Sequence, residues 1–379
     1  MTVAIWAASA FCGLAIAFQL ASIAIAIVRC RMPAREVPPP DDAPPITIIR
    51  PVCGIDNFVE ATLRSTFLLD YPRCEILFCA ASARDPVVAL VQSLIAEHPH
   101  VPAKVLVGDE RISANPKLNN VLKGWRAAAH DRIVMVDSNV LLPRDYLQRL
   151  LAAWTFDTGM VSAPPIGSHP SGLWAQLECV FLNTYQARWQ YVADTIGLGF
   201  AQGKTLFYHR GDIEAAGGLR ALATEAAEDA ASTKIMRATG RRVRLVDAPF
   251  PQPLGERRRG DVWDRQVRWA RLRRDSFPSF YCLEAGSGAL LPFLAAIFIA
   301  IATGYSVIVA AGAFLVIWYG AEMLLAASAG WHLPLLYPLH AMLRDAMLPV
   351  LWLEGWREAG FVWRGNAMSV DEGDQAKPA

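Results

Sequence analysis

The sequence predicts an α/β protein with a mainly parallel sheet, together with one N-terminal and two C-terminal transmembrane helices. Between residues 46 and 282, short β-branched runs alternate with longer helical stretches, as strands joined by crossover helices do. Long uncharged runs lie on both sides of this region. Only 19% of the 379 residues are charged, against roughly 25% in soluble domains, and the mean hydropathy is +0.26. Either an unusually large core or lipid contact must account for this apolar excess, and lipid contact is the first interpretation.

The N-terminal uncharged run, Ile5–Val28, has the roughly 20 apolar residues that cross a bilayer core. No cationic side chain precedes it, so residues 1–29 are predicted to be a retained transmembrane helix rather than a cleaved signal peptide. Arg29 and Arg31 follow, and cationic flanks favour the cytoplasmic side. We therefore expect the next domain in the cytoplasm, after a stiff Pro-rich linker at residues 30–45.

The C-terminal uncharged run, Ala285–Ala321, is close to the length of two spans, and a turn is expected at Gly304. Residues 283–328 are therefore predicted to form two transmembrane helices. One long tilted span with an interfacial piece is the alternative. Two spans would return the chain to the cytoplasmic side.

The segment Leu335–Trp352 is apolar but contains Arg344 and Asp345, and charges of this kind are rare in transmembrane segments. Residues 329–366 are therefore predicted to be an interfacial or re-entrant segment. Residues 367–379 are predicted to be a disordered tail.

Residues 46–282 are predicted to form one cytoplasmic domain. Its expected strands are Ile46–Ile49, Glu75–Phe78, Ala103–Val107, Arg132–Val136 and Gly159–Ser162. Its expected helices are Phe58–Leu69, Pro86–His98 and Lys117–Ala129. In a parallel sheet with this element order, ligands bind at the carboxyl ends of the strands. We expect the functional residues there.

Asp137 and Asn139 directly follow the expected strand Arg132–Val136. Phosphate chemistry needs an oxygen ligand for a hard divalent cation that also bridges a diphosphate, so Asp137 is a candidate metal ligand. An Asx turn at the strand end explains the same residues equally well. The sequence alone leaves both interpretations open.

Glu228 and Asp229 lie in a stretch of strong helix formers that follows the Gly217-Gly218 turn. Acids near a helix start interact favourably with the positive end of the helix, and this is the purely structural interpretation. A general base needs the same placement, with one carboxylate close to an acceptor hydroxyl. The pair is therefore a candidate for proton transfer.

Arg265, Arg268 and Trp269 share one face of an expected helix within a basic segment. Two guanidinium groups and an indole on that face can converge on a diphosphate leaving group. Attraction to lipid headgroups is the alternative, because the segment precedes an apolar run. Nucleic acid is excluded as a partner, because the patch is local and the formal net charge is only +1.

The segment Asn115–Asn120 leads into an expected helix. Lys117 and the asparagine amides, including that of Asn119, can reach a phosphate or a sugar from this loop. A proline at the first helical position with flanking asparagine caps is the structural explanation.

Gly203 and Lys204 look like the end of a phosphate-binding loop. Position 198 is Leu where that motif requires Gly, so the segment is not a Walker motif. No Gly-x-Ser-x-Gly or Gly-x-Gly-x-x-Gly follows a strand, which argues against hydrolase and dinucleotide-binding functions.

Taken in chain order, these segments resemble the ceramide glucosyltransferase family, whose members are inverting enzymes with the nucleotide-sugar transferase fold called GT-A. The resemblance covers nearly all of residues 46–274, and the predicted membrane layout agrees with it. Its motifs are Arg50–Asp56, Asn115–Asn120, Asp137–Asn139, Gly203–Phe207, Glu228-Asp229 and Arg265–Trp269. Each motif is weak alone, whereas the ordered set is specific.

This resemblance implies roles for the strongest candidates. Asp229 is expected to be the catalytic base, and Asp137 is expected to bind the donor diphosphate through a divalent cation, Mn²⁺ or Mg²⁺. Arg265, Arg268 and Trp269 are expected to contact the diphosphate and the acceptor.

This sequence departs from the family pattern at two places. The family's first aspartate falls at Ser82 in this chain, so Asp85, three residues further on, is its displaced counterpart. The segment Asp137–Asn139 lacks the second acid of a full Asp-x-Asp. The further residues expected to bind substrate are Lys117, Asn119, Asn139, Gly203, Lys204 and Glu228.

The resemblance implies transfer of glucose from UDP-glucose to the primary hydroxyl of ceramide. The protein would be a multi-pass protein of a bacterial-type inner membrane with its catalytic domain in the cytoplasm. Another lipid acceptor, such as diacylglycerol or a hopanoid, or another UDP-sugar is the closest alternative. A processive polysaccharide synthase fits less well, because three spans offer little material for a polymer channel. A degenerate domain that binds UDP-sugar without turnover is compatible with the displaced Asp85.

Overall fold

The computed structural model describes residues 2–31, 35–357, 360–363 and 366–369. The chain divides into two compact units, each with its own apolar clusters. The unit that we call the sheet unit comprises Pro33–His169, Ala193–Glu256 and Ala359–Ala379, and the helical unit comprises Met1–Met32, Pro170–Val192 and Arg257–Glu358.

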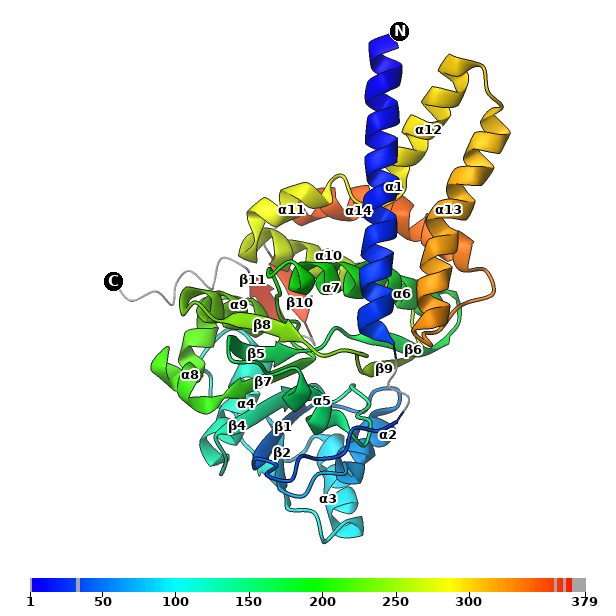
Figure 1. Ribbon diagram of the computed structural model, residues 1–379. Coiled ribbons are helices and arrows are strands. Elements are labelled where there is room, and N and C mark those ends of the chain that lie inside the picture. Colours follow the sequence, from blue (N-terminus) through cyan, green and yellow to red (C-terminus); the bar gives the residue numbers. More distant parts are fainter. Residues whose placement is uncertain (1, 32–34, 358–359, 364–365, 370–379) are drawn as a thin grey trace. The chain divides into compact units, whose positions relative to one another are not determined.

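Seven strands form the central sheet of the sheet unit, in the order β3-β2-β1-β4-β7-β5-β8 (Figure 1). Most neighbours are parallel, but β7 runs antiparallel to both β4 and β5. The predicted mainly parallel sheet is therefore confirmed. The strands are β1 (Ile46–Val52), β2 (Cys74–Ala80), β3 (Ala103–Val107), β4 (Arg132–Val136), β5 (Thr158–Ser162), β7 (Thr205–His209) and β8 (Arg242–Leu245).

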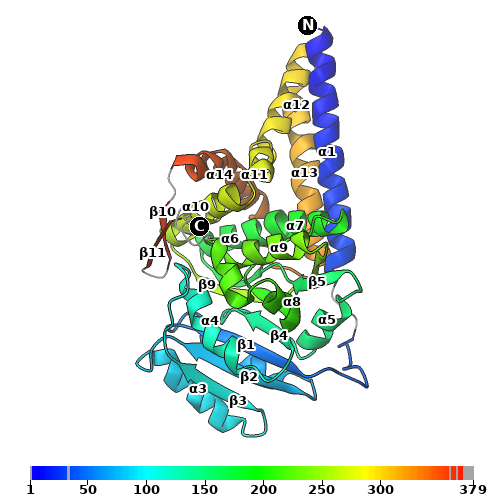
Figure 2. The same ribbon diagram turned by 90° about the vertical axis from the view of Figure 1, so that its left-hand side faces the viewer.

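Helices cover both faces of this sheet, as the side-chain alternation along β1 requires. Ile46 and Ile48 belong to the apolar cluster that contains the buried side of α3, whereas Ile49 belongs to the cluster under α4 (Figure 2). The helical elements are α2 (Val59–Arg64), η1 (Ser65–Leu68), α3 (Pro86–Glu97), α4 (Pro116–Ala127), α5 (Tyr146–Ala152), α8 (Arg210–Ala215), η3 (Gly218–Thr224) and α9 (Glu228–Ala238).

The starts of two predicted helices have the expected chemistry. Asp85 caps α3 and Asn115 caps α4, and each helix then begins with a proline, whose missing N–H costs nothing there. The predicted helix Phe58–Leu69 is instead a short α-helix followed by a 3-10 turn. All five predicted strands are present, whereas β7 and β8 were not predicted.

Four further strands lie outside the central sheet. β6 (Ile166–Ser171) pairs with β9 (Pro251–Glu256), and β10 (Gly360–Trp363) pairs antiparallel with β11 (Asn366–Ser369). The predicted tail 367–379 thus begins within a strand, and its residues 370–379 lie outside the described residues. In the predicted linker, the hydroxyl of Tyr71 donates to the carbonyl of Pro44 over 2.6 Å, which ties this end of the linker to the sheet unit.

The helical unit is built around a group of apolar helices. α1 packs against α12 and α13, which also pack against each other (Figure 1). α10 packs against α6, α11 and α14. The elements are α1 (Thr2–Cys30), α6 (Leu173–Val180), the π-helix η2 (Phe181–Ala187), α7 (Arg188–Thr195, which continues into the sheet unit), α10 (Arg259–Ser276), α11 (Pro278–Glu284), α12 (Leu290–Thr303), α13 (Val307–Ser328) and α14 (Tyr337–Arg357).

Two helices among the described residues, α1 and α13, are long and apolar enough to cross a membrane. α12 has only 14 residues, fewer than the roughly 20 expected of a span. The turn predicted at Gly304 is present, because this residue ends α12 with a φ of 77°, a conformation that favours glycine. The predicted pair of C-terminal spans is therefore one long helix and one short one.

The predicted cytoplasmic domain and the predicted interfacial segment can both be compared with the structure. Residues 170–192 and 257–282, predicted to belong to the cytoplasmic domain, group with the apolar helices. The predicted interfacial segment Leu335–Trp352 lies almost wholly in α14, where Arg344 and Asp345 are buried and paired, with Arg344 Nε 2.8 Å from Asp345 Oδ1. Its placement at a membrane surface stays a prediction.

Candidate active site

The antiparallel strand β7 brings two predicted site residues together. Val136 of β4 is opposite Thr205 of β7, and just beyond this pair the backbone N–H of Asp137 donates to the carbonyl of Lys204 over 3.1 Å. The Lys204 ammonium lies 2.8 Å from Asp137 Oδ2 and 3.1 Å from Asn139 Oδ1. The two oxygen-bearing residues of the loop after β4 therefore hold a cation between them.

Lys117 joins this group from the first turn of α4. Its buried ammonium lies 2.7 Å from Asp137 Oδ1 and 2.7 Å from Glu228 Oε1, and it also donates to the carbonyl of Gly203. Burial lowers the pKa of Lys117, but the two carboxylates outweigh burial and hold it above its usual range. Lys117 therefore stays charged and connects the loop after β4 to α9.

The carboxyl of Asp137 is held ionised by these contacts. Burial raises its pKa, but Lys117 and Lys204 more than compensate and hold the pKa well below its usual range. Both carboxylate oxygens contact ammonium groups, so the side chain of Asp137 has contacts beyond those of a simple Asx turn. Its role as a metal ligand stays a prediction.

Asp229 lies at the other end of the same group, in the first turn of α9. Its Oδ2 accepts from the backbone N–H of Gly203 over 2.7 Å, and its Oδ1 accepts from that of Ala230 over 2.8 Å. Burial and the neighbouring Glu228 raise the pKa of Asp229 to about 7, although Lys117 and the two N–H groups lower it. A carboxyl that titrates near neutral pH is suited to accept a proton in catalysis.

Gly203 allows this close packing because it lacks a side chain. A Cβ at this position would lie 2.8 Å from Glu228 Oε1 and 3.2 Å from Lys117 Nζ. Its N–H contacts the candidate base and its carbonyl contacts Lys117. Gly203 is thus the direct link between Asp229 and the charged cluster formed by Lys117, Asp137, Lys204 and Glu228.

Two predicted substrate-binding residues have mainly structural contacts. Asn119 Oδ1 accepts from the N–H groups of Ile112 and Ser113, at 2.9 and 3.0 Å, and so fixes the loop before α4. Asp85 caps α3, and both of its oxygens lie 3.0 Å from the N–H of Gly54, in the loop after β1. The structure does not bring these two side chains into the charged cluster, and their roles toward substrate stay predictions.

Two further residues shape the site. Both lie in sequence motifs named above, but neither was predicted individually as a site residue. Arg50 is fully buried in β1, and its guanidinium donates to the carbonyls of Asp137 and Val140 at 3.0 and 2.8 Å, which fixes the loop after β4. Asn115 Nδ2 donates to Glu228 Oε2 over 2.7 Å. A charged residue inside an otherwise apolar strand was the available signal for Arg50.

The predicted basic signature lies on α10 in the helical unit. Arg265 forms an ion pair with the buried Glu178, and its guanidinium lies 5.9 Å from the ring centroid of Trp269. Arg257 Nε also lies 3.5 Å from Glu178 Oε2. Arg265 and Trp269 thus share a face as predicted, and Arg268 lies on the same helix. Their contact with a diphosphate stays a prediction.

A model of glycosyl transferase family 21 matches residues 14–376 of this chain. The chain belongs to glycosyl transferase family 21. It is therefore an enzyme of glycosyl transfer, as its sequence motifs predicted, and the resemblance found among those motifs is confirmed.

Curated relatives of this family 21 enzyme include ceramide glucosyltransferases. Ceramide glucosyltransferase 1 of Caenorhabditis elegans is 25% identical over 353 residues, covering 90% of this chain and 75% of the relative. The ceramide glucosyltransferase of Komagataella phaffii is 38% identical over 123 residues, 31% of this chain and 24% of the relative.

A solved structure has a similar fold. The mannosyltransferase PcManGT from Pyrobaculum calidifontis, in complex with GDP-Man and Mn²⁺, matches with a TM-score of 0.53 and 18% identity, over 93% of this chain and 96% of that one. This likeness supports the predicted nucleotide-sugar transferase fold of the family 21 enzyme.

The residues around Asp137 are compatible with a divalent cation. Asp137 and Asn139 offer two hard oxygens that already bracket a positive charge, the Lys204 ammonium. Among the described residues no group of three or more His, Cys, Asp or Glu side chains could enclose a metal. Mg²⁺ commonly binds through one or two carboxylates and completes its shell with water and substrate phosphates, so a two-ligand site of this kind suffices. Lys204 would have to leave that position.

Proposed function

We propose that this enzyme transfers glucose from UDP-glucose to the primary hydroxyl of ceramide, with inversion at the anomeric carbon. The ceramide glucosyltransferases among its relatives support this choice of donor and acceptor. The observation that carries the proposal is the arrangement around Gly203, which joins the buried carboxyl of Asp229 to a cluster of two lysines and two carboxylates.

Asp229 acts as the general base. In its ionised form it takes the proton of the attacking hydroxyl while the oxygen bonds to the anomeric carbon from the face opposite UDP. The bond from that carbon to the diphosphate oxygen breaks, and UDP leaves with the electron pair. The N–H groups of Gly203 and Ala230 hold the carboxylate in place, so its orientation is set before the acceptor arrives.

Lys117 supplies fixed positive charge for the diphosphate, which gains negative charge as it leaves, and Lys204 supplies a second positive charge that would move aside when a cation binds. Lys117 is held by Asp137 and Glu228, whereas Lys204 is held by Asp137 and Asn139. Mn²⁺ or Mg²⁺ would be held by Asp137 and Asn139, and when bound it would neutralise charge on the leaving diphosphate. Arg265 and Arg268 are proposed to contact the same group.

The apolar helices are proposed to keep the enzyme at the cytoplasmic face of a cell membrane. A ceramide-like acceptor leaves the bilayer only at high cost, so a membrane-bound enzyme must meet it at the surface. The exposed apolar side chains of α1, such as Trp6 and Phe18, are the kind of surface that lipid would cover.

The test uses the full chain purified in detergent with a panel of labelled UDP-sugars against ceramide, diacylglycerol, a hopanoid polyol and no lipid. Glucose transfer to ceramide supports the proposal, and transfer to another lipid alone would keep the chemistry but change the acceptor. Binding of UDP-sugar without transfer to any lipid would contradict the proposed function.

A further inference from the structure

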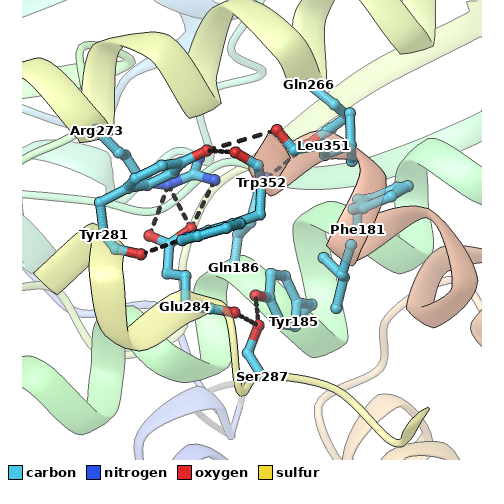
Figure 3. Close-up of a pocket in the computed structure, with 11 residues that line it drawn as sticks. Phe181, Tyr185, Gln186, Gln266, Arg273, Tyr281, Glu284, Ser287, Leu351 and Trp352 are labelled. Atoms are coloured by element: carbon cyan, nitrogen blue, oxygen red, sulfur yellow. Dashed lines mark hydrogen bonds and ion pairs between the residues drawn. The ribbon is translucent and has the colours of Figure 1, made fainter. Parts of the chain in front are cut away.

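A small pocket of the helical unit, between η2, α10, α11 and α14, has no room for a substrate (Figure 3). Its volume is about 20 Å³, which is enough for about one water molecule. Gln186 and Gln266 lie in its lining, and each has one buried polar atom without a hydrogen-bond partner in the described structure. One water molecule can satisfy both atoms, so this pocket is part of the protein interior rather than a substrate site.

The charged cluster of the sheet unit is different, because its own side chains already balance its charge. Lys117 and Lys204 supply two positive charges, whereas Asp137 and Glu228 supply two negative charges. These side chains are largely withdrawn from water, with exposed fractions between 8% and 21%. Water therefore screens a charge added to this group only weakly, and the added charge needs a compensating one.

Lys204 occupies the position in which the loop after β4 would bind a cation. Its ammonium lies 2.8 Å from Asp137 Oδ2 and 3.1 Å from Asn139 Oδ1. If a divalent cation took this position alone, Lys204 would be displaced and two positive charges of the cluster would lack partners. An ionised Asp229, which is linked to the cluster through Gly203, would offset only one of them.

The diphosphate of a nucleotide-sugar supplies the missing negative charge. It carries two negative charges, so a divalent cation and a diphosphate that bind together add no net charge to the cluster. The displaced ammonium of Lys204 gains phosphate oxygens as new partners. The carbonyl of Lys204 accepts from the N–H of Asp137 over 3.1 Å, so the backbone can stay in place while the flexible side chain moves.

We propose that Lys204 is a counter-ion that the site exchanges for a divalent cation, so that the cation and the nucleotide-sugar bind cooperatively. In the empty site its ammonium holds Asp137 and Asn139 together, and on binding it passes to the diphosphate. The cation alone then binds weakly. This inference rests on the nucleotide-sugar donor of the proposed function and deepens it by coupling two ligands of the same site.

Binding of Mn²⁺ and UDP to the full chain in detergent tests the coupling. UDP carries the diphosphate common to all UDP-sugars. Free Mn²⁺ is measured from its electron paramagnetic resonance signal, with correction for the Mn²⁺–UDP complex that forms without protein. We expect saturating UDP to tighten Mn²⁺ binding about 100-fold, and Mn²⁺ to tighten UDP binding by the same factor, because coupling is reciprocal. Independent binding of the two would overturn the inference.

A variant separates the exchange from direct contact between cation and diphosphate, which also couples the two ligands. Lys204→Met removes the ammonium and leaves the cluster with an excess negative charge. Mn²⁺ alone should then bind about tenfold more tightly, and the coupling factor should fall by at least as much. Lys234→Met on α9 is the matched control, because Lys234 is 42% exposed and pairs with Glu225.

Two results with Lys204→Met would refute the exchange. These are an unchanged coupling factor and weaker binding of Mn²⁺ alone, and either would leave Lys204 with a structural role. If this variant does not fold, Lys204→Gln replaces it, because glutamine keeps a hydrogen-bond donor without the charge.

The two proposals fail in different ways. Coupled binding of Mn²⁺ and UDP without glucose transfer to any lipid would contradict the proposed function and keep the exchange. Glucose transfer to ceramide by an enzyme that binds Mn²⁺ and UDP independently would keep the function and overturn the exchange.

Discussion

The backbone N–H of Gly203 donates to Asp229 Oδ2 over 2.7 Å. Through its carbonyl the same residue accepts a hydrogen bond from Lys117, which in turn contacts Asp137 and Glu228. The proposed base and the proposed diphosphate-binding groups are thus joined by one residue without a side chain. This relationship makes the site sensitive to small changes at Gly203.

Gly203→Ala should lower kcat by roughly 10–100-fold, because the new Cβ would lie 2.8 Å from Glu228 Oε1 and force that carboxylate to move. The apparent Tm should change little, since the displacement is local. Gly260→Ala on α10 is the matched control, because a Cβ there meets nothing within 4 Å. Full activity of Gly203→Ala would show that the close packing is not needed for turnover.

The pH dependence of turnover should follow the ionisation of the Asp229 carboxyl. Its pKa is raised to about 7, chiefly by burial and by Glu228, and the base must be ionised to accept a proton. The rate should therefore rise with pH through about 7 and level off above it. Asp229→Asn should lower kcat by roughly 10²–10⁴-fold while UDP-glucose binding is retained. A near-normal rate in this variant would exclude Asp229 as the base.

The same pKa predicts an effect of opposite sign on stability. The folded protein binds a proton at Asp229 between the unfolded pKa of 3.8 and about 7, so the free energy of unfolding falls as pH rises through this window. Asp229→Asn removes this loss, and the variant should have a higher apparent Tm than the unchanged protein at pH 8. At pH 3 to 4 the two should be nearly equal. Asp212→Asn, in α8, serves as the control at both pH values.

Removal of divalent metal tests whether a cation binds between Asp137 and Asn139. Treatment with EDTA should abolish most transfer, and Mn²⁺ or Mg²⁺ should restore it. Lys204→Met should bind Mn²⁺ more tightly than the unchanged protein without donor, because the competing ammonium is gone. Titration calorimetry gives this result independently of turnover.

Two outcomes would contradict that prediction. Unchanged transfer after EDTA, combined with weak UDP-glucose binding by Lys204→Met, would show that the ammonium itself serves as the cation. Equal Mn²⁺ binding by Lys204→Met and Asp137→Asn would place the metal elsewhere.

Sequence reasoning succeeded where local chemistry determines structure. The β-branched runs predicted β1 to β5, and the cap-then-proline pairs at Asp85 and Asn115 predicted the starts of α3 and α4. The same reasoning identified Asp137, a member of the charged cluster, and Asp229, which Gly203 links to that cluster. Their catalytic roles stay predictions. Asp137 follows the end of a strand and Asp229 lies at the start of a helix. Both boundaries can be recognised in the sequence, which is why these residues stood out as candidates.

The features it missed depend on pairing between distant segments. β7 was not predicted, and the contact between Lys204 and Asp137 exists only because β7 runs antiparallel beside β4. Apolar composition suggested two spans after residue 283, but α12 starts only at Leu290, after Gly288 with a φ of 86°. Composition marks an apolar region, whereas the residues at its edge decide where the helix begins.

Arg50→Met should destabilise the protein, because Arg50 holds the loop after β4. The fully buried guanidinium donates to the carbonyls of Thr62, Asp137 and Val140, at 2.8 to 3.0 Å. Methionine fills similar space but donates no hydrogen bond, so the carbonyl of Val140 loses this donor. The carbonyls of Thr62 and Asp137 each keep a second donor, Ser65 Oγ and the N–H of Val140. A buried, unsatisfied acceptor costs about 1–3 kcal/mol, so the free energy of unfolding should fall by about that amount.

Denaturant unfolding of the full chain, followed by tryptophan fluorescence, measures this loss. Because Arg50 also fixes the loop that carries Asp137, the folded fraction of Arg50→Met should bind UDP-glucose more weakly than the unchanged protein under stabilising conditions. Arg64→Met is the control, since Arg64 pairs with Glu60 and Glu97 at the surface and such pairs contribute about 0–1 kcal/mol. Equal stability of the two variants would mean that the loop after β4 holds its shape without the Arg50 guanidinium.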